Sequence, residues 1–253
     1  MLVLLPPSEG KATARRGTPL DLDRLSFPEL TTTRGRLVSA LERLARTQPE
    51  ALRVALGLTQ RQTAELASDA ALTSAPTLPA LRLYTGVVYE ALGYETLTGG
   101  AKRRANSSLV VASALFGLVR PGDRLPPYRL SGGTTLPGTG GLAAIWRPAL
   151  EPLLARESGL VVDLRSGTYA ALARVPRAVE VRVLRESAGQ RSVVSHDNKW
   201  TKGLLARALC ESGARSVRDV AEAARSIADL VEVDGRRVDL VLRGLARAQT
   251  VSG

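Results

Sequence analysis

The chain has 253 residues, of which 44% are hydrophobic and 23% charged, a composition typical of a folded globular protein rather than a disordered one. No apolar run approaches the roughly 20 residues of a membrane span, so we expect no membrane partner. A single His and a single Cys exclude a zinc site built from His and Cys ligands. One cysteine cannot form an internal disulfide, so we expect a cytoplasmic protein. The formal charge of +11 predicts attraction to polyanions, of which nucleic acid is the usual one.

The first predicted element is a short buried strand over residues 1–5, an apolar run that stops at two prolines. The turn that follows places a hydroxyl, a carboxylate and an ammonium close together on Ser8, Glu9 and Lys11. Strand ends in α/β proteins are where functional sites are built, so these three residues are candidate catalytic groups. The alternative is a surface loop with an incidental Ser and Lys.

Residues 35–72 are predicted to form a helical subregion, because leucines recur at helical spacing. Within it, residues 52–67 place an apolar-Gly-apolar tripeptide between two helical patterns, which resembles the hairpin of a helix-hairpin-helix element. There, Gly57 and Thr59 would offer backbone N–H groups to a phosphate. We favour the alternative, an ordinary corner in which Gly57 ends a helix, because Thr59 occupies the position of the usual second glycine.

In the middle of the chain, the sequence predicts a linker at 73–79 and an apolar segment with a glycine turn at 81–92. A buried strand that runs into a turn is predicted at 108–121. It is followed by a glycine-rich loop at 131–141 and an amphipathic helix at 142–156. The alternation of these patterns is irregular, so it does not predict a repeated βαβ rhythm.

In the C-terminal part, the sequence predicts a fully buried strand at 160–164 and a half-exposed strand at 179–184 with a hairpin partner at 192–195. Helices are predicted at 196–208 and 219–227, and a hairpin at 231–242. Together these patterns predict one mixed α/β domain over residues 1–253, with a mixed sheet flanked by helices.

Several of these segments are similar to those of a known family. Leu4-Leu5-Pro6-Pro7-Ser8-Glu9-Gly10-Lys11 resembles the N-terminal signature of the high-GC branch of the YaaA peroxide-stress family, a former domain of unknown function. The further motifs follow in the family's order: Tyr84-Thr85-Gly86-Val87-Val88-Tyr89, Leu115-Phe116-Gly117-Leu118-Val119-Arg120-Pro121, Pro127-Tyr128-Arg129-Leu130, Val162-Asp163-Leu164-Arg165-Ser166 and the run from Lys199 to Gly203. The better-known branch has Ser-Pro-Ala-Lys-Thr after its first strand, so the resemblance supports Lys11 more strongly than Ser8 or Glu9.

The resemblance implies a cytoplasmic bacterial protein that helps cells survive hydrogen peroxide. It further implies a link to limiting free iron and DNA damage, and DNA binding through a basic cleft with a helix-hairpin-helix element. We expect no cofactor and no metal site.

If the motif residues converge on one cleft, they provide cations beside aromatic rings, which suits a phosphate backbone with stackable bases. The candidate DNA-binding or anionic-ligand-binding residues are Lys11, Tyr84, Tyr89, Arg120, Tyr128, Arg129, Arg165, Ser166, Lys199 and Lys202. Asp163 and Lys202 join the candidate catalytic groups, although Asp163 equally suits an ion pair with Arg120 or Arg165. The first hypothesis is non-sequence-specific DNA binding in peroxide defence; the alternative is an enzyme acting on a small anionic, nucleotide-like substrate in the same cleft.

Overall fold

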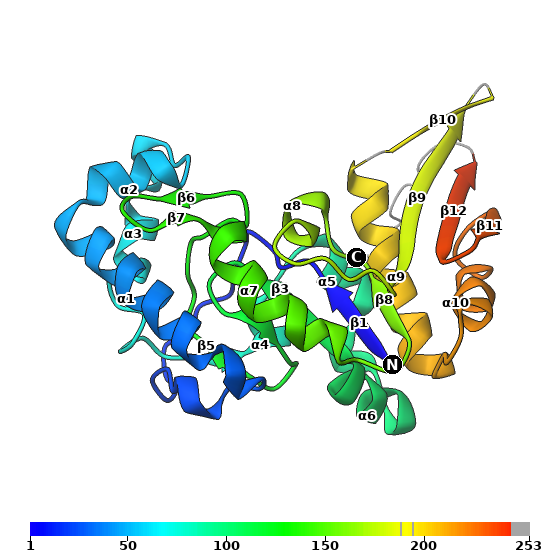
Figure 1. Cartoon of the computed structure of the whole chain (residues 1–253), viewed down its shortest axis with the longest axis horizontal. Coiled ribbons are helices and arrows are strands. Elements are labelled where there is room, and N and C mark those ends of the chain that lie inside the picture. Colours follow the sequence, from blue (N-terminus) through cyan, green and yellow to red (C-terminus); the bar gives the residue numbers. More distant parts are fainter. Residues whose placement is uncertain (188, 194, 244–253) are drawn as a thin grey trace, which may run out of the picture.

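The computed structural model describes residues 1–187, 189–193 and 195–243, and it confirms the predicted α/β fold with a mixed sheet (Figure 1). Eight strands form one sheet in the order β11-β12-β9-β8-β1-β3-β4, with β10 paired to β9. Their bounds are β1 Leu2–Leu5, β3 Leu109–Ser113, β4 Gly117–Val119, β8 Val161–Asp163, β9 Val179–Ser187, β10 Gln190–Ser192, β11 Leu230–Asp234 and β12 Arg237–Arg243. Short strands form two further pairs: β2 Leu78–Pro79 with β5 Arg124–Leu125, and β6 Thr135–Leu136 with β7 Gly140–Gly141.

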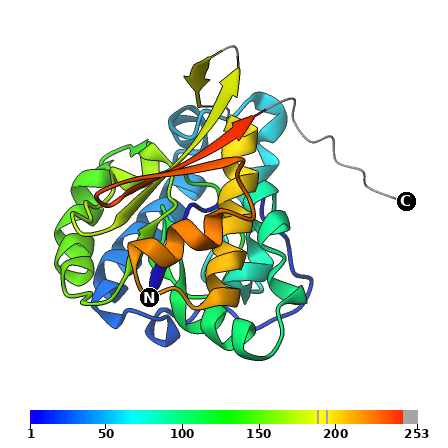
Figure 2. The same cartoon turned by 90° about the vertical axis from the view of Figure 1, so that its right-hand side faces the viewer.

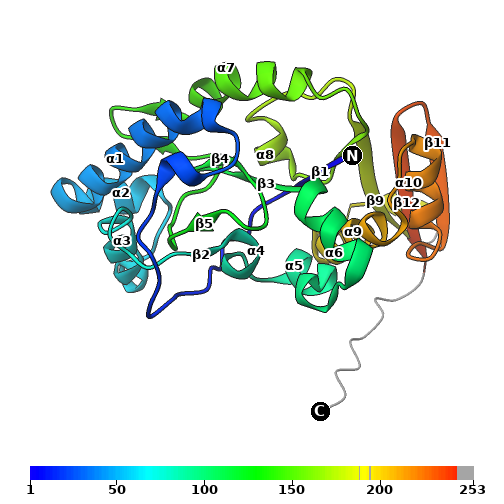
Figure 3. The same cartoon turned by 90° about the horizontal axis from the view of Figure 1, so that it is seen from below.

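Helices cover both faces of the sheet: α7 lies on one side, and α5, α6 and α9 lie on the other (Figure 3). Their bounds are α1 Thr31–Thr47, α2 Pro49–Ala55, α3 Ala64–Asp69, α4 Ala80–Leu83, α5 Val87–Leu92, α6 Gly99–Ser108, α7 Leu142–Ala155, α8 Gly167–Ala170, α9 Ser195–Ser212 and α10 Val217–Ala224. Four 3-10 turns, η1 to η4, span Leu22–Arg24, Pro28–Leu30, Gln60–Gln62 and Tyr94–Thr96. Figure 2 shows the other end of the molecule, where α10 lies against α9 beside the hairpin of β11 and β12. Within the described part of the chain, no helix has both the length and the apolar character that crossing a membrane requires.

The centre of the sheet is parallel and its edges are antiparallel. β1 pairs in parallel with β3 on one side and with β8 on the other, and every residue of β1 is buried. A strand covered on both faces reads as a continuous apolar run, which is why residues 1–5 were recognisable in the sequence. β4, β10 and β11 add the antiparallel edges.

The connections after β1 and β8 lead toward opposite edges of the sheet. The chain leaves β1 through the helical subregion and returns at β3, on one side of the β1–β8 pair. It leaves β8 through α8 and returns at β9, on the other side of that pair. Such a divergence opens a crevice outside the carboxyl ends of the two strands, the place where α/β sheets bind ligands.

The corner after α2 takes the conformation that we favoured from the sequence. Gly57 has φ +64°, its N–H binds the carbonyl of Val54 at 3.0 Å, and Leu58 N–H binds the carbonyl of Arg53 at 3.0 Å. This pair of hydrogen bonds is the Schellman motif, so Gly57 ends a helix. Thr59 follows as the cap of the 3-10 turn η3. A helix-hairpin-helix contact with DNA is not shown by this geometry.

One predicted strand is wrong in position. The hairpin partner of β9 is Gln190–Ser192, and Ser195 already begins α9, so the prediction of a strand at 192–195 fails. The local pattern of small and β-branched residues places the strand two to three residues too late. Ala188, between the two strands predicted for this hairpin, lies outside the described residues.

Candidate functional site

A cavity of about 870 Å³ opens at the carboxyl ends of β1 and β8. Its walls come from segments far apart in the sequence: residues 6–11 after β1, 164–169 after β8, 85–89 at the start of α5, 129–131, and the beginning of α9. Leu56 and Gly57 of the corner described above also reach it. The motifs that were separate in the sequence therefore meet at the crevice that the topology creates.

The turn after β1 is fixed by its own serine. Ser8 Oγ donates to the carbonyl of Gly10 at 2.6 Å and accepts from Thr85 N–H at 3.0 Å. Thr85 N–H also lies 3.3 Å from the carbonyl of Gly10, and a Cβ on Gly10 would lie 3.1 Å from the Thr85 hydroxyl. Ser8 thus positions the turn against the segment before α5, and its hydroxyl already has two partners.

Lys11 is held at the base of this turn. Its Nζ donates to the carbonyls of Ser8 at 3.0 Å and Glu9 at 3.3 Å, and lies 4.2 Å from the ring centroid of Tyr128. Burial, followed by the nearby Arg129 guanidinium, lowers the pKa of Lys11 to about 8. A lysine with this pKa carries an appreciable fraction of neutral amine at physiological pH.

Two of the predicted base-stacking tyrosines lie beneath the cavity rather than in it. Tyr84 and Tyr128 are only 1% and 4% exposed, and their hydroxyls are 2.9 Å apart. The Tyr128 hydroxyl also lies 2.8 Å from that of Ser113. Both rings are covered by protein, so they leave no face for a base and instead support the Lys11 ammonium. Tyr89 lines the cavity, with its hydroxyl donating to the carbonyl of Pro6 at 2.7 Å.

Asp69, at the end of α3, is a buried carboxylate that the sequence analysis missed. It is 0% exposed; Oδ1 accepts from Arg129 N–H at 2.8 Å, and Oδ2 has no hydrogen-bond partner in the part of the chain that is described. Burial raises its pKa to about 7, opposed by the Arg129 N–H and the Lys11 ammonium. The sequence pattern could have indicated its burial, because Asp69 shares a helical face with Leu66 and Leu72, where an apolar residue is expected.

The end of β8 supplies a closed ion pair and a buried lysine. Asp163 and Arg165 form a bidentate pair at 2.9 and 2.7 Å, and the Arg165 guanidinium also donates to the carbonyls of Tyr169 and Ala173. This is the alternative that the sequence left open for Asp163. Lys202 Nζ donates to the carbonyl of Arg165 at 3.1 Å, and burial lowers its pKa.

The remaining candidates divide into those at the cavity and one that lies away from it. Lys199, Ser166 and Arg129 line the cavity, and Arg129 pairs with Glu9 at 3.5 Å and with Glu65 at 3.3 Å. The side chain of Glu9 is 85% exposed.

Arg120 does not line this cavity. Its guanidinium lies 5.1 Å from the ring of Phe27 and donates to the carbonyl of Ser107, while its N–H binds Asp123 at 2.8 Å. The expectation that all the motif residues face one cleft therefore does not extend to Arg120, which stabilises the turn after β4.

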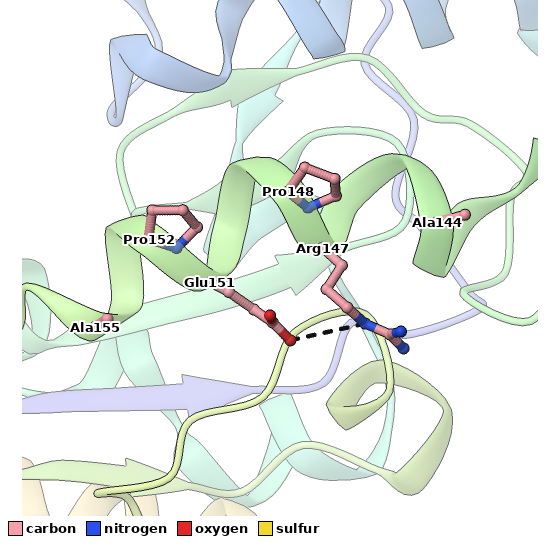
Figure 4. Close-up of a pocket in the computed structure, with 6 residues that line it drawn as sticks. All are labelled: Ala144, Arg147, Pro148, Glu151, Pro152 and Ala155. Carbon is pink, nitrogen blue, oxygen red and sulfur yellow. Dashed lines mark ion pairs between the residues drawn. The ribbon is translucent and has the colours of Figure 1, made fainter.

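Another hollow lies along α7 and lacks this convergence of charges. Figure 4 shows its lining, which comes from α7 alone and contains two prolines, Pro148 and Pro152. Its one cation, Arg147, is 3.7 Å from Glu151. A groove made by one helix, with its charges paired, offers few groups that could orient a ligand. Among the described residues, no group of three or more His, Cys, Asp and Glu is arranged to hold a metal ion.

Comparison with known proteins identifies the family. A family model described as "Peroxide stress protein YaaA" matches residues 1–227. The chain belongs to this family. It is 46% identical over 252 residues to a UPF0246 protein of Corynebacterium efficiens, covering 96% of this chain and 99% of that protein. It is 44% identical over 243 residues to a UPF0246 protein of Streptomyces coelicolor, covering 92% and 93%. A more distant UPF0246 protein, from Idiomarina loihiensis, is 30% identical over 156 residues, covering 57% and 60%.

Proposed function

We propose that this member of the peroxide stress family acts in the cytoplasm by binding DNA without sequence preference, and so limits the DNA damage and free iron that accompany peroxide. One observation carries the proposal: Lys11, Arg129, Lys199 and Lys202, from separate parts of the sequence, surround one cavity at the carboxyl ends of β1 and β8. The net charge of +11 supplies the long-range attraction that brings a polyanion to it.

The four cations have different roles in this proposal. Lys199 is exposed and reaches a phosphate from the solvent side, whereas Arg129 is half-buried and reaches one by exchanging its ion pairs with Glu9 and Glu65. Lys11 and Lys202 are more deeply placed and add positive potential from below. Arg165 contributes little net charge, because Asp163 neutralises it.

DNA binding is tested by fluorescence anisotropy with a short duplex at several salt concentrations. We expect affinity to fall steeply with salt, and Lys199→Ala to weaken binding and to reduce the slope of log affinity against log salt by about one, because one phosphate contact is lost. The control is Arg103→Ala on α6. This helix leads into the amino end of β3, and β3 is parallel to β1, so that end of the strands is opposite to the cavity. Equal losses in both variants, or a flat salt dependence in the unmodified chain, would remove the cavity from the DNA-binding surface.

A second function is favoured by a specific observation, namely an enzyme acting on a small anionic, nucleotide-like substrate. The cavity volume of about 870 Å³ falls within the range of small-molecule sites. A lysine whose pKa is lowered to about 8 lines it, and an aspartic acid whose pKa is raised to about 7 is buried beside that lysine; acid–base chemistry uses pairs of this kind. The Lys11→Arg variant separates the two functions, because it keeps the charge and removes the amine.

A further inference from the structure

Lys11 differs from the other lysines in the surroundings of its amino group. Lys102 forms an ion pair with Glu95 at 3.4 Å, and Lys199 is exposed. Lys202, like Lys11, donates to a backbone carbonyl, but the neighbouring charges that act on it are the carboxylates of Asp163 and Glu180. Lys11 lines the cavity, and no carboxylate of the described residues lies within ion-pair distance of its Nζ. The neighbouring charge that acts on it most strongly is another cation, Arg129.

The hydrogen bonds of Lys11 suit a neutral amine as well as an ammonium. Nζ has two carbonyl acceptors, those of Ser8 at 3.0 Å and Glu9 at 3.3 Å. A neutral amine has two N–H groups and one lone pair, so both of its hydrogens are satisfied and its lone pair remains. A lysine that is desolvated and placed next to another cation is the arrangement that activates this side chain as a nucleophile.

The carboxyl group of Asp69 is close enough to the amine for each to shift the pKa of the other. Tyr128, whose ring centroid lies 4.2 Å from Nζ, is followed by Arg129, whose N–H binds Asp69 Oδ1 at 2.8 Å. Asp69 Oδ2 is fully buried and has no partner among the described residues, so its hydrogen-bonding capacity is unused. As a carboxylate, Asp69 would stabilise a positive charge that forms at Lys11.

From this arrangement we propose that Lys11 Nζ is a nucleophile that forms an imine with the aldehyde or ketone of a phosphate-bearing ligand in the cavity. The phosphate-binding part rests on the proposed function, with Arg129 and Lys199 as the cations that reach it. The ligand chemistry has two sources: a small sugar phosphate, or the open-chain sugar of a DNA site that has lost its base.

The step balances without an oxidant or a reductant. The Nζ lone pair attacks the carbonyl carbon and forms a C–N bond while the C=O π electrons move to oxygen. Two protons pass from nitrogen to that oxygen, by way of solvent, and the oxygen leaves as water. The C=N bond that remains is protonated to an iminium ion, whose charge Asp69 stabilises.

The experiment traps this imine in the full chain. Glyceraldehyde 3-phosphate, or a duplex oligonucleotide with one abasic site, is added with sodium cyanoborohydride at pH 7, and the adduct is located by intact-mass and peptide analysis. At that pH, a pKa of about 8 in place of 10.5 gives about 300-fold more neutral amine. Arg129 lowers this pKa while Asp69, Glu9 and Glu65 raise it.

We expect one adduct, at Lys11, forming at least about tenfold faster than at Lys199. Peptide analysis separates it from any product at the α-amine of Met1. Lys11→Arg should remove the adduct and Lys102→Arg should keep it. Because the chain has four lysines, the other three are controls within the same molecule.

Modification spread evenly over the four lysines, or none at Lys11 with either probe, would overturn the inference. Because the result is read in the unmodified chain, it does not depend on whether a variant folds. An adduct with only one of the two probes supports the inference and identifies the source of the carbonyl. Fluorescence anisotropy with undamaged duplex DNA is measured in parallel. An adduct at Lys11 without DNA binding overturns the proposed function and supports the imine. DNA binding without an adduct at Lys11 supports the proposed function and overturns the imine.

Discussion

Burial shifts the protonation of Lys11 and Asp69 in opposite directions. Desolvation disfavours the ammonium of one and the carboxylate of the other, so their pKa values, ordinarily well separated, become about 8 and about 7. Their mutual attraction opposes both shifts without cancelling them. Near neutral pH Lys11, which lines the cavity, can therefore exchange a proton with a ligand, which it could not do efficiently at its ordinary pKa.

The first prediction concerns the pH dependence of stability that Asp69 causes. The pKa of this side chain is 3.8 when it is exposed in the unfolded chain and about 7 in the fold, so the folded state binds the proton more tightly. The stabilisation from that proton is complete below pH 3.8 and is lost as pH rises to about 7. We expect the unmodified chain to lose up to about 4 kcal/mol relative to Asp69→Asn across this range, since each pKa unit corresponds to about 1.4 kcal/mol.

Urea unfolding of both proteins between pH 4 and pH 8 measures this difference. The charged neighbours of this position, Lys11, Arg129 and Glu65, are present in both proteins, and Lys11 keeps its charge over most of this range. A difference in unfolding free energy that stays constant from pH 4 to pH 8 would contradict the raised pKa.

The sequence predicted the residues that line the cavity better than the buried residues next to Lys11. Lys11, Lys199 and Lys202 were found because they stand in motifs, and the structure brings them to one cavity. Asp69 was missed because its role depends on burial by segments far away in the sequence. Tyr128 was interpreted as a base-stacking ring for the same reason: the sequence shows an aromatic residue between Pro and Arg but not the protein that covers it.

At the scale of elements, the cavity wall depends on how closely α5 and α9 approach. Gly203 of α9 faces α5 so closely that a Cβ would lie 2.3 Å from the carbonyl oxygen of Val88 and 2.7 Å from the Cβ of Ala91. Both obstacles are fixed to the helix, so neither can move aside alone. Since Val88 and Lys202 line the cavity, the contact between these helices also sets its width.

The second prediction follows from this contact. Gly203→Ala should push α5 and α9 apart and destabilise the protein by about 1–3 kcal/mol, the usual cost of overpacking. It should also weaken DNA binding, because it displaces Lys199 and Lys202 relative to the turn after β1. Urea unfolding and fluorescence anisotropy measure the two effects.

The matched control is Gly57→Ala, which adds the same methyl group at a helix end with no atom within 4 Å of the new Cβ. Its cost is about 1 kcal/mol of backbone strain from the positive φ. A smaller destabilisation by Gly203→Ala than by Gly57→Ala would contradict the close packing of α5 and α9.

The elements were predictable where the hydrophobic pattern was continuous. β1 and β8 were found because parallel strands buried on both faces read as apolar runs. β10 was misplaced because its three residues are exposed and carry no such pattern. Strand order, which decides that β1 and β8 are neighbours and so places the cavity, comes from pairing between distant segments and has no local signature.

At the scale of the whole molecule, positive charge is abundant but much of it is paired. Arginines form ion pairs along the C-terminal strands, such as Arg182 with Asp239 and Arg191 with Glu232. These pairs contribute little to attraction at a distance, because the opposite charges cancel. What distinguishes the cavity is that Lys11, Lys199 and Lys202 gather there, and none of these three lysines forms an ion pair with a described residue.

The last prediction asks whether protection from peroxide needs only this charge. Lys11→Arg keeps a cation in the cavity and removes the amine, since a guanidinium does not lose its proton at neutral pH. If Lys11 is a nucleophile, the variant should bind DNA within about twofold of the unmodified chain but fail to restore peroxide survival to cells that lack the protein. Lys199→Arg, at the exposed rim, should preserve both properties. Circular dichroism must first show that each variant folds, because Lys11 is packed over Tyr128. If Lys11→Arg preserved both DNA affinity and peroxide survival, Lys11 would contribute charge alone, and the site would be an electrostatic surface rather than a catalytic one.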